Sequence, residues 1–170
     1  MILHLIRHPR PIVAAGTCYG RRDVAAENPA PAAARLRAAL PAGLPVWSSP
    51  SRRCLALAQL LADQPITDAR LMEMDFGDWE GRPWDDIPRE QLDAWAADIA
   101  GYAPPSGESP LQVQARALDF VADLSVPEAV LVTHAGVIRM LLAHQRGLTL
   151  AQSLKLDIPY ASHTVIDWLR

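Results

Sequence analysis

The stretch Leu3-His4-Leu5-Ile6-Arg7-His8-Pro9 decides the expected fold, because a short apolar run ends abruptly in a cation and an imidazole. Apolar runs of this length that are bounded by proline are typical of buried strands in an α/β sheet. In open parallel sheets, ligands bind just beyond the carboxyl ends of the strands. We therefore expect Arg7 and His8 to lie at a ligand-binding edge.

A second strand of the same kind lies far downstream. The β-branched run Val130-Leu131-Val132-Thr133 ends in His134-Ala135-Gly136, and a helical pattern follows directly. If this strand and the first are parallel neighbours, their carboxyl ends lie at the same edge of the sheet. The imidazoles of His8 and His134 would then face each other.

The rest of the chain alternates between strand-like and helix-like patterns. We expect further strands over 45–48, 65–68, 155–158 and 164–168, the last two as a hairpin, and helices over 33–40, 51–61, 90–97, 110–122 and 138–142. Ordered loops are expected over 9–26 and over the acid-rich stretch 70–81. This alternation predicts one domain over residues 1–170, a three-layer α/β/α sandwich with a mostly parallel central sheet.

Composition narrows the function classes. A net charge of -3 and a pI near 5.9 give no basic surface of the size that nucleic-acid binding needs. The first residues are too short and lack the basic start of a signal peptide, and no apolar run is long enough for a membrane span. Cysteine is rare, with only Cys18 and Cys54, which favours a reducing compartment. We expect a soluble cytoplasmic protein that binds neither nucleic acid nor membrane; the oligomeric state is open.

The residue types at the strand ends favour phosphoryl chemistry. Guanidinium groups such as those of Arg7, Arg52 and Arg53 match phosphate oxygens, and helix N-termini add backbone donors. Histidine supplies a nucleophile that is active near neutral pH. The leaving oxygen also needs a proton, which an acid of the 70–81 loop can provide: Glu73, Asp75, Asp78 or Glu80.

Each of these residues also has a plain structural interpretation. A single histidine at a strand end is usually structural, an isolated arginine is often a salt-bridge partner, and loop acids are mostly solvated. Cys18 and Cys54 fit best as inert small apolar residues. The joint occurrence of His8, His134 and the arginines at strand ends is what favours catalysis.

Four motifs in order resemble the histidine phosphatase superfamily of phosphoglycerate mutase-like proteins. They are Leu5-Ile6-Arg7-His8, Ser48-Ser49-Pro50-Ser51-Arg52-Arg53-Cys54, the acid-rich stretch Leu71 to Gly81, and Val132-Thr133-His134-Ala135-Gly136. The resemblance implies the phosphoglycerate mutase-like fold, a phosphohistidine formed on His8, and no metal or other cofactor. It also implies that Arg53, rather than Arg52, holds phosphate and that Glu73 is the general acid.

Within the superfamily, the chain is most similar to the α-ribazole phosphatases, which remove the 5′-phosphate of α-ribazole phosphate in cobalamin assembly. The segments that carry this similarity are Cys18 to Val24, Phe76 to Gly81 and Pro105 to Ser109. Two residues depart from the family pattern. Pro9 stands where glycine is usual and removes a backbone donor, and Leu57 replaces a common threonine.

The resemblance therefore implies a phosphomonoesterase with a small-molecule substrate. Arg7, Arg53 and His134 would hold phosphate, Thr17 would add a hydroxyl, and the remaining substrate contacts would come from Tyr19, Arg21 and Glu108. The alternatives are a histidine phosphatase for a sugar phosphate or a phosphohistidine protein, a mutase, and an inactive phosphate-binding module. A zinc site at His8 and His134 lacks an evident third ligand, and the sequence has no nucleotide-binding Gly-x-x-x-x-Gly-Lys-Ser/Thr loop.

Overall fold

The computed structural model describes residues 1–169 and has a five-stranded sheet of order β3-β2-β4-β1-β5 at its centre. The strands are β1 (Ile2–Arg7), β2 (Val46–Ser48), β3 (Ile66–Thr67), β4 (Glu128–Thr133) and β5 (His163–Asp167). β4 pairs in parallel with both β1 and β2, and β3 pairs in parallel with β2. β5 runs antiparallel beside β1. The predicted mostly parallel sheet is thus confirmed.

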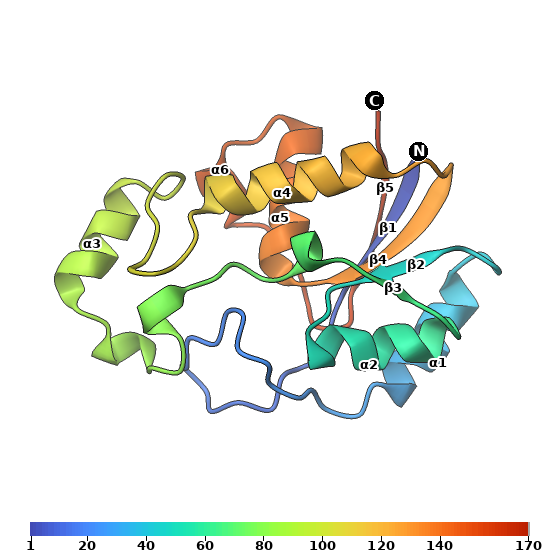
Figure 1. Cartoon of the computed structure of the whole chain (residues 1–170), viewed down its shortest axis with the longest axis horizontal. Helices are drawn as coiled ribbons and strands as arrows, with labels where there is room; N and C mark the ends of the chain where they lie inside the picture. The colour runs from blue at the N-terminus through green and yellow to red at the C-terminus, as the bar shows by residue number, and fades with distance from the viewer. Residues whose placement is uncertain (170) are drawn as a thin grey trace.

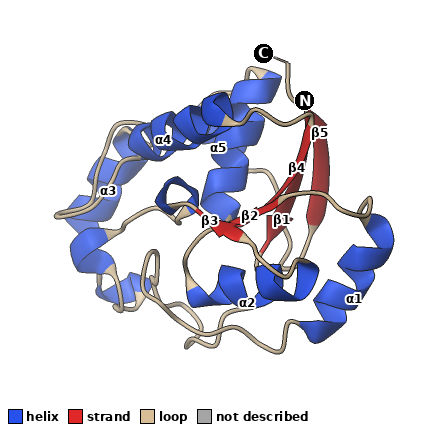
Figure 2. Ribbon diagram, turned by 45° about the vertical axis from the view of Figure 1, so that its right-hand side comes forward, coloured by secondary structure: helices blue, strands red, loops and turns tan. Residues whose placement is uncertain are grey.

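Helices cover both faces of this sheet. The α-helices of the described residues are α1 (Ala30–Ala39), α2 (Arg52–Leu61), α3 (Arg89–Ala97), α4 (Pro110–Asp123), α5 (Ala135–Arg146) and α6 (Leu150–Ser153). Figure 1 shows α4 and α5 on one side of the strands and α1 and α2 on the other. Figure 2 shows the same layers from a second direction. The predicted three-layer α/β/α architecture is confirmed.

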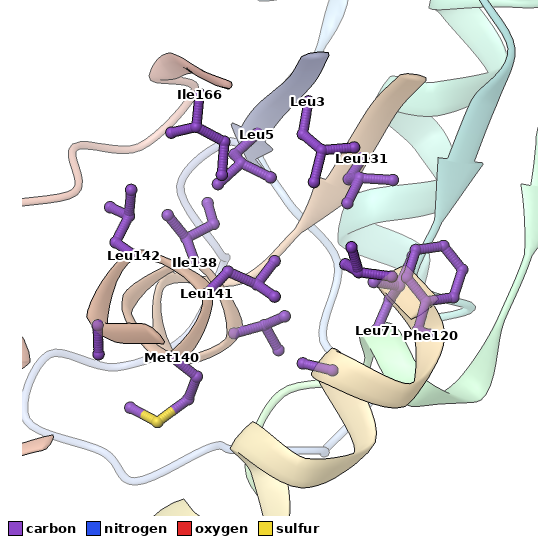
Figure 3. Close-up of a cluster of buried hydrophobic side chains, with 14 of the residues drawn as sticks. Leu3, Leu5, Leu71, Phe120, Leu131, Ile138, Met140, Leu141, Leu142 and Ile166 are labelled. Atoms are coloured by element: carbon purple, nitrogen blue, oxygen red, sulfur yellow. The ribbon is translucent and has the colours of Figure 1, made fainter. Parts of the chain in front are cut away.

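The alternation of side chains along the central strands builds a separate core on each face. Figure 3 shows Leu3, Leu5 and Leu131 of β1 and β4 packed against α5, and all three side chains are fully buried. On the other face, Ile6 and its β4 neighbours pack against α1 and α2. Burial of one such side chain stabilises the fold by about 1.5–3 kcal/mol. The substitution Leu131→Ala is therefore expected to cost about 2–5 kcal/mol.

The helix α4 shows how a capping sequence fixes a helix start. Ser109 accepts a hydrogen bond from the backbone N–H of Gln112, whose side chain in turn accepts one from the Ser109 N–H. This reciprocal pair satisfies backbone donors that the helix itself cannot. The helix begins at Pro110, as Ser109-Pro110 predicted.

The C-terminal segment differs from the sequence prediction. The stretch 155–158, predicted as one arm of a hairpin, forms no strand, and β5 alone closes the sheet. Backbone carbonyls of this stretch accept hydrogen bonds from arginine side chains instead: Leu156 accepts from Arg139, and Ile158 accepts from Arg7. The short helix α6 was also not predicted.

The helix α3 lies apart from the sheet, at the left of Figure 1. None of its residues is buried, and it packs through Leu92 and Trp95 against a small cluster of Cys18, Trp79 and Ile87. Within residues 1–169, no helix has both the length and the apolar character needed to cross a membrane.

Candidate active site

The carboxyl ends of β1, β2 and β4 meet at one edge of the sheet. Arg7 pairs in register with Thr133, and the backbone N–H of His8 donates to the Thr133 carbonyl at 3.0 Å. On the other side of β4, the Ser49 N–H donates to the Val132 carbonyl at 2.9 Å. His8, His134 and the turn that begins α2 therefore converge, as the strand patterns predicted.

The His8 imidazole is buried and held in one orientation. Its Nδ1 lies 2.6 Å from the carbonyl oxygen of Pro9. Because a carbonyl can only accept, Nδ1 carries the proton, and Nε2 keeps its lone pair. Burial, reinforced by the charges of Arg53 and Arg7, lowers the pKa of His8 to about 3. His8 is thus a neutral, oriented imidazole with a free nucleophilic nitrogen.

His134 faces His8 across the same edge. The centroids of the two rings lie 5.1 Å apart, and their planes are inclined by 64°. His134 is fully buried at the N-terminus of α5, and its Nε2 lies 2.8 Å from the Ser49 hydroxyl oxygen. Burial holds the pKa of His134 well below its usual value, so this ring is also neutral.

Arg53 supplies buried positive charge beside the histidines. Its Nη1 donates to the Arg22 carbonyl at 2.8 Å and its Nη2 to the Gly20 carbonyl at 2.7 Å. The side chain is fully buried, and its Nε has no hydrogen-bond partner within residues 1–169. The neighbouring Arg52 is exposed, which agrees with the choice of Arg53 that the family resemblance implies.

Arg7 is held in a similar way. Its guanidinium lies 3.7 Å from the centroid of the Tyr160 ring, and its Nη1 donates to the Ile158 carbonyl at 2.5 Å. Its Nε is buried without an acceptor within residues 1–169. A buried donor that stays unsatisfied costs about 1–3 kcal/mol.

Glu73 lies at the N-terminus of α5. Its carboxylate accepts hydrogen bonds from the backbone N–H groups of Met74 at 3.0 Å and Gly136 at 3.3 Å. A Cβ atom at Gly136 would overlap the Glu73 carboxylate, so the glycine leaves room for this carboxylate in its present position. Glu73 is half-buried, which leaves its carboxyl accessible to a proton acceptor.

Arg21 and Glu108, which are predicted to contact the substrate, bind each other and the backbone around Glu73. Arg21 Nη2 donates to Glu108 at 3.2 Å, and its Nε donates to the Glu73 carbonyl at 3.2 Å. Arg116 binds the same carboxylate through Nε at 2.7 Å and donates to the same carbonyl at 3.1 Å. These charges hold the pKa of Glu108 below its usual value against the effect of burial. The three residues therefore fix the backbone of Glu73.

Thr17 and Tyr19 lie on the loop between β1 and α1. Thr17 pairs with Pro83 through its backbone, and its hydroxyl makes no hydrogen bond to His8, Arg7 or Arg53 among the described residues. The Tyr19 ring lies 5.3 Å from the Arg53 guanidinium carbon and its hydroxyl bonds Tyr160. Burial, together with this bond, raises the Tyr19 pKa. Tyr19 therefore contacts Arg53 directly, and Thr17 lines the same surface pocket as Tyr19.

Sequence reasoning missed several residues that build this site. They are Ser49, which contacts His134; Arg116, which fixes Glu73; Arg139, whose pKa is lowered by burial and by the nearby charge of Arg7; and Tyr160, beneath Arg7. Ser49 belongs to the motif Ser48 to Cys54, in which only the arginines were predicted to act. The others come from α4, α5 and a loop, where no local pattern marks them.

The comparisons with known proteins agree with this geometry. The model of the histidine phosphatase superfamily (branch 1) matches residues 3–170. The chain belongs to this superfamily. The phosphoglycerate mutase-like fold that the sequence predicted is likewise confirmed, because solved structures with that fold cover the whole chain.

Relatives in this superfamily are phosphatases and a mutase. The chain is 36% identical over 122 residues to the glucosyl-3-phosphoglycerate phosphatase of Mycolicibacterium vanbaalenii, a match that covers 61% of this chain and 53% of that protein. The chain thus spans about half the length of that curated relative. A mycobacterial glucosyl-3-phosphoglycerate phosphatase structure has a TM-score of 0.81 at 29% identity and covers 96% of this chain and 88% of its own. A structure described as phosphoglycerate mutase from Thermus thermophilus has a TM-score of 0.80 at 32% identity, covering 100% of this chain and 95% of its own.

The two cysteines of the chain are buried, and neither forms a disulfide. Cys54 lies 3.4 Å from His134 Nε2, whereas Cys18 packs with Trp79 and Ile87. Burial raises the pKa of Cys18 to about 12 and also raises that of Cys54. Both shifts favour the thiol over the thiolate, which is the reactive form.

Proposed function

We propose that this histidine phosphatase is a metal-independent phosphomonoesterase that forms a phosphohistidine on His8. The observation that carries the proposal is the buried, neutral His8, whose Nδ1 is fixed by the Pro9 carbonyl. Beside it, Arg7 and Arg53 each have a buried Nε without a protein acceptor within residues 1–169. A nucleophile and nearby guanidinium groups that can stabilise charge on the phosphoryl oxygens are what phosphoryl transfer requires.

In the first step, the Nε2 lone pair of His8 attacks phosphorus in line. A nitrogen–phosphorus bond forms as the bond from phosphorus to the substrate oxygen breaks. Arg7, Arg53 and His134 hold the other phosphoryl oxygens, which carry the charge. Glu73, protonated at this stage, gives its proton to the departing oxygen, so that an alcohol leaves rather than an alkoxide.

In the second step, a water molecule attacks the phosphohistidine. An oxygen–phosphorus bond forms and the nitrogen–phosphorus bond breaks, which returns His8 to its neutral state. The Glu73 carboxylate accepts the proton from water and is then ready for another turnover. The products are the free alcohol and inorganic phosphate. The hydrogen bonds from Met74 and Gly136 keep the Glu73 carboxyl in place through both steps.

The substrate that we propose is α-ribazole 5′-phosphate, in cobalamin assembly. The support is the similarity of Cys18 to Val24, Phe76 to Gly81 and Pro105 to Ser109 to the α-ribazole phosphatases. These segments surround Glu73 in the structure, since Glu108 and Arg21 bind its backbone region. A sugar phosphate or a phosphohistidine protein is the alternative substrate, and the glucosyl-3-phosphoglycerate phosphatase relative favours testing sugar phosphates first.

The test is phosphate release in excess EDTA from α-ribazole 5′-phosphate, a panel of sugar phosphates, 3-phosphoglycerate and an aryl phosphate. The proposal predicts turnover without metal and the highest kcat/KM for α-ribazole 5′-phosphate. Equal, slow hydrolysis of the whole panel would retain the phosphatase and reject the cobalamin role. Conversion of 3-phosphoglycerate to an isomer would favour a mutase. No reaction with any substrate would favour an inactive binding module.

A further inference from the structure

A cavity of about 180 Å³ adjoins Glu73 and has no part in the two steps above. Its walls are mostly apolar and include Phe76, Trp84, Trp95, Val113 and Met140. Glu73 and Gly136 form part of the same lining, and Gly136 donates to the Glu73 carboxylate. The cavity therefore begins at the group that protonates the departing oxygen.

The aromatic wall of this cavity is built from rings that order one another. The rings of Trp84 and Trp95 are stacked with centroids 6.0 Å apart and planes inclined by 11°. Phe76 meets both edge-on, at 5.6 Å from Trp84 and 6.3 Å from Trp95. Such stacked and edge-on arrangements favour a further flat ring against them. The Trp95 Nε1 is also buried without an acceptor in the described part of the chain.

We propose that this cavity binds a flat aromatic or heteroaromatic ring carried by the leaving alcohol of the substrate. The inference rests on the proposed phosphomonoesterase function and names its substrate class. The position supports it, because the leaving group must extend from phosphorus past Glu73, and the cavity starts there. The size supports it as well, since an apolar cavity of about 150 Å³ accepts a benzene ring.

The lining of the cavity disfavours other occupants. The apolar walls would leave most oxygens of a phosphoryl group without donors, and the mechanism holds that group at Arg7, Arg53 and His134 instead. An unsubstituted sugar would leave its hydroxyls without partners along the same walls, which is unfavourable. Arg139 lies at the same lining and donates through Nε to the Leu156 carbonyl, and its terminal nitrogens, which make no hydrogen bond within residues 1–169, are available to a polar substituent of the ligand.

The test compares 2-phenylethyl phosphate with propyl phosphate, which are esters of primary alcohols of similar acidity. The wild-type protein is expected to prefer the phenylethyl ester by about tenfold or more in kcat/KM, since a buried ring adds binding that the propyl chain lacks. The ratio of the two kcat/KM values does not depend on the fraction of folded enzyme. A variant that lowers stability therefore does not change the ratio by itself.

Two variants alter the cavity in opposite ways. Trp95→Ala removes an aromatic wall from α3, a helix without buried residues, and Leu154→Trp fills the cavity from a position that is 40% exposed. Both are expected to lower the ratio to about 2 or less, because the kcat/KM of the phenylethyl ester falls more than that of the propyl ester. Trp168→Ala is the control, because Trp168 is a buried tryptophan that stacks on His144 and lines no part of this cavity.

The outcomes separate the inference from the function on which it rests. Hydrolysis of both esters at similar rates, or a ratio unchanged in Trp95→Ala and in Leu154→Trp, would overturn the aromatic site and leave the phosphatase standing. Hydrolysis of neither ester would overturn the phosphatase and the inference together. A high ratio with slow turnover of α-ribazole 5′-phosphate would support the cavity and reject that particular substrate.

Discussion

The imidazoles of His8 and His134 lie with their centroids 5.1 Å apart, although the two residues come from opposite ends of the chain. The cause is the pairing of β1 with β4, in which Arg7 is level with Thr133. His8 and His134 directly follow these two paired residues, so both histidines lie at the same edge of the sheet. Because both rings are buried and neutral, one can act as a nucleophile while the other contacts the phosphoryl oxygens.

Glu73→Gln tests the general acid. Glutamine keeps the size of the side chain but cannot supply a proton, so turnover of alkyl phosphates is expected to fall by about 10²–10⁴-fold. The kcat/KM of an aryl phosphate, which reports only the steps up to release of the leaving group and so excludes the role of Glu73 as base, should fall by no more than about threefold, because that leaving group needs no proton. The kcat/KM values of both esters measure this difference, with Glu90→Gln on the exposed side of α3 as the control. Equal slowing of both esters would remove Glu73 from the acid role.

Gly136→Ala tests whether the position of the Glu73 carboxyl matters. The added Cβ would overlap this carboxyl, a flexible group that can move away. We expect alkyl phosphate turnover to fall by about 10²-fold, as for other small displacements of a catalytic group, with little change in Tm. A variant with normal turnover and an unchanged fold would show that Glu73 does not need this position.

Arg116→Lys tests the side chains that fix the Glu73 backbone. Lysine keeps the charge but cannot reproduce the paired bonds to Glu108 or the bond to the Glu73 carbonyl. We expect kcat/KM for alkyl phosphates to fall by about tenfold, with a smaller loss for an aryl phosphate, because the aryl leaving group does not need the displaced acid. Arg89→Lys, in the exposed pair with Asp93, is the matched control and should be neutral. Equal losses on both esters would indicate a general structural role instead.

The buried histidines predict how stability depends on pH. The folded pKa of His8 is about 3, below its ordinary value of 6.5, so the unfolded chain binds a proton more readily between these values. Stability from this group is therefore complete above pH 6.5 and is lost as the pH falls toward 3. At about 1.4 kcal/mol per pH unit, His8 alone costs roughly 2 kcal/mol by pH 5. Denaturant unfolding at pH 5 and pH 7.5 measures this loss, which His8→Gln should reduce. An equally steep loss in His8→Gln would contradict this assignment.

The sequence alone predicted the sheet, its layers and the ends of its strands, because apolar strand patterns and turn residues are local signals. The convergence of His8 and His134 also followed, since parallel neighbours end at one edge. The predicted helix 110–122 is present as α4, but the sequence did not show which face it buries. Leu111, Ala115, Leu118 and Ala122 recur at helical spacing, and so do Val113, Ala117, Phe120 and Val121, which are the residues that the helix buries.

The sequence did not predict what the polar side chains contact. Arg21 and Glu108 were predicted as substrate contacts, and no pattern in the sequence indicated that they bind each other or that Arg21 binds the Glu73 carbonyl. The stretch 155–158 looked like a strand, but its carbonyls accept from Arg7 and Arg139. These contacts join residues that are distant in the chain, and no periodicity in the sequence records them.

The most direct test of the account is to stop the reaction during turnover and to determine which residue carries the phosphoryl group. With a radioactive phosphoryl group in the substrate, we expect a label on His8 that survives base and is lost in acid, as phosphohistidine is. His8→Ala should lose the label and turnover, whereas His144→Ala, at a position far from the site, should keep both. An acid-stable label, a label on another residue, or full turnover in His8→Ala would contradict the account.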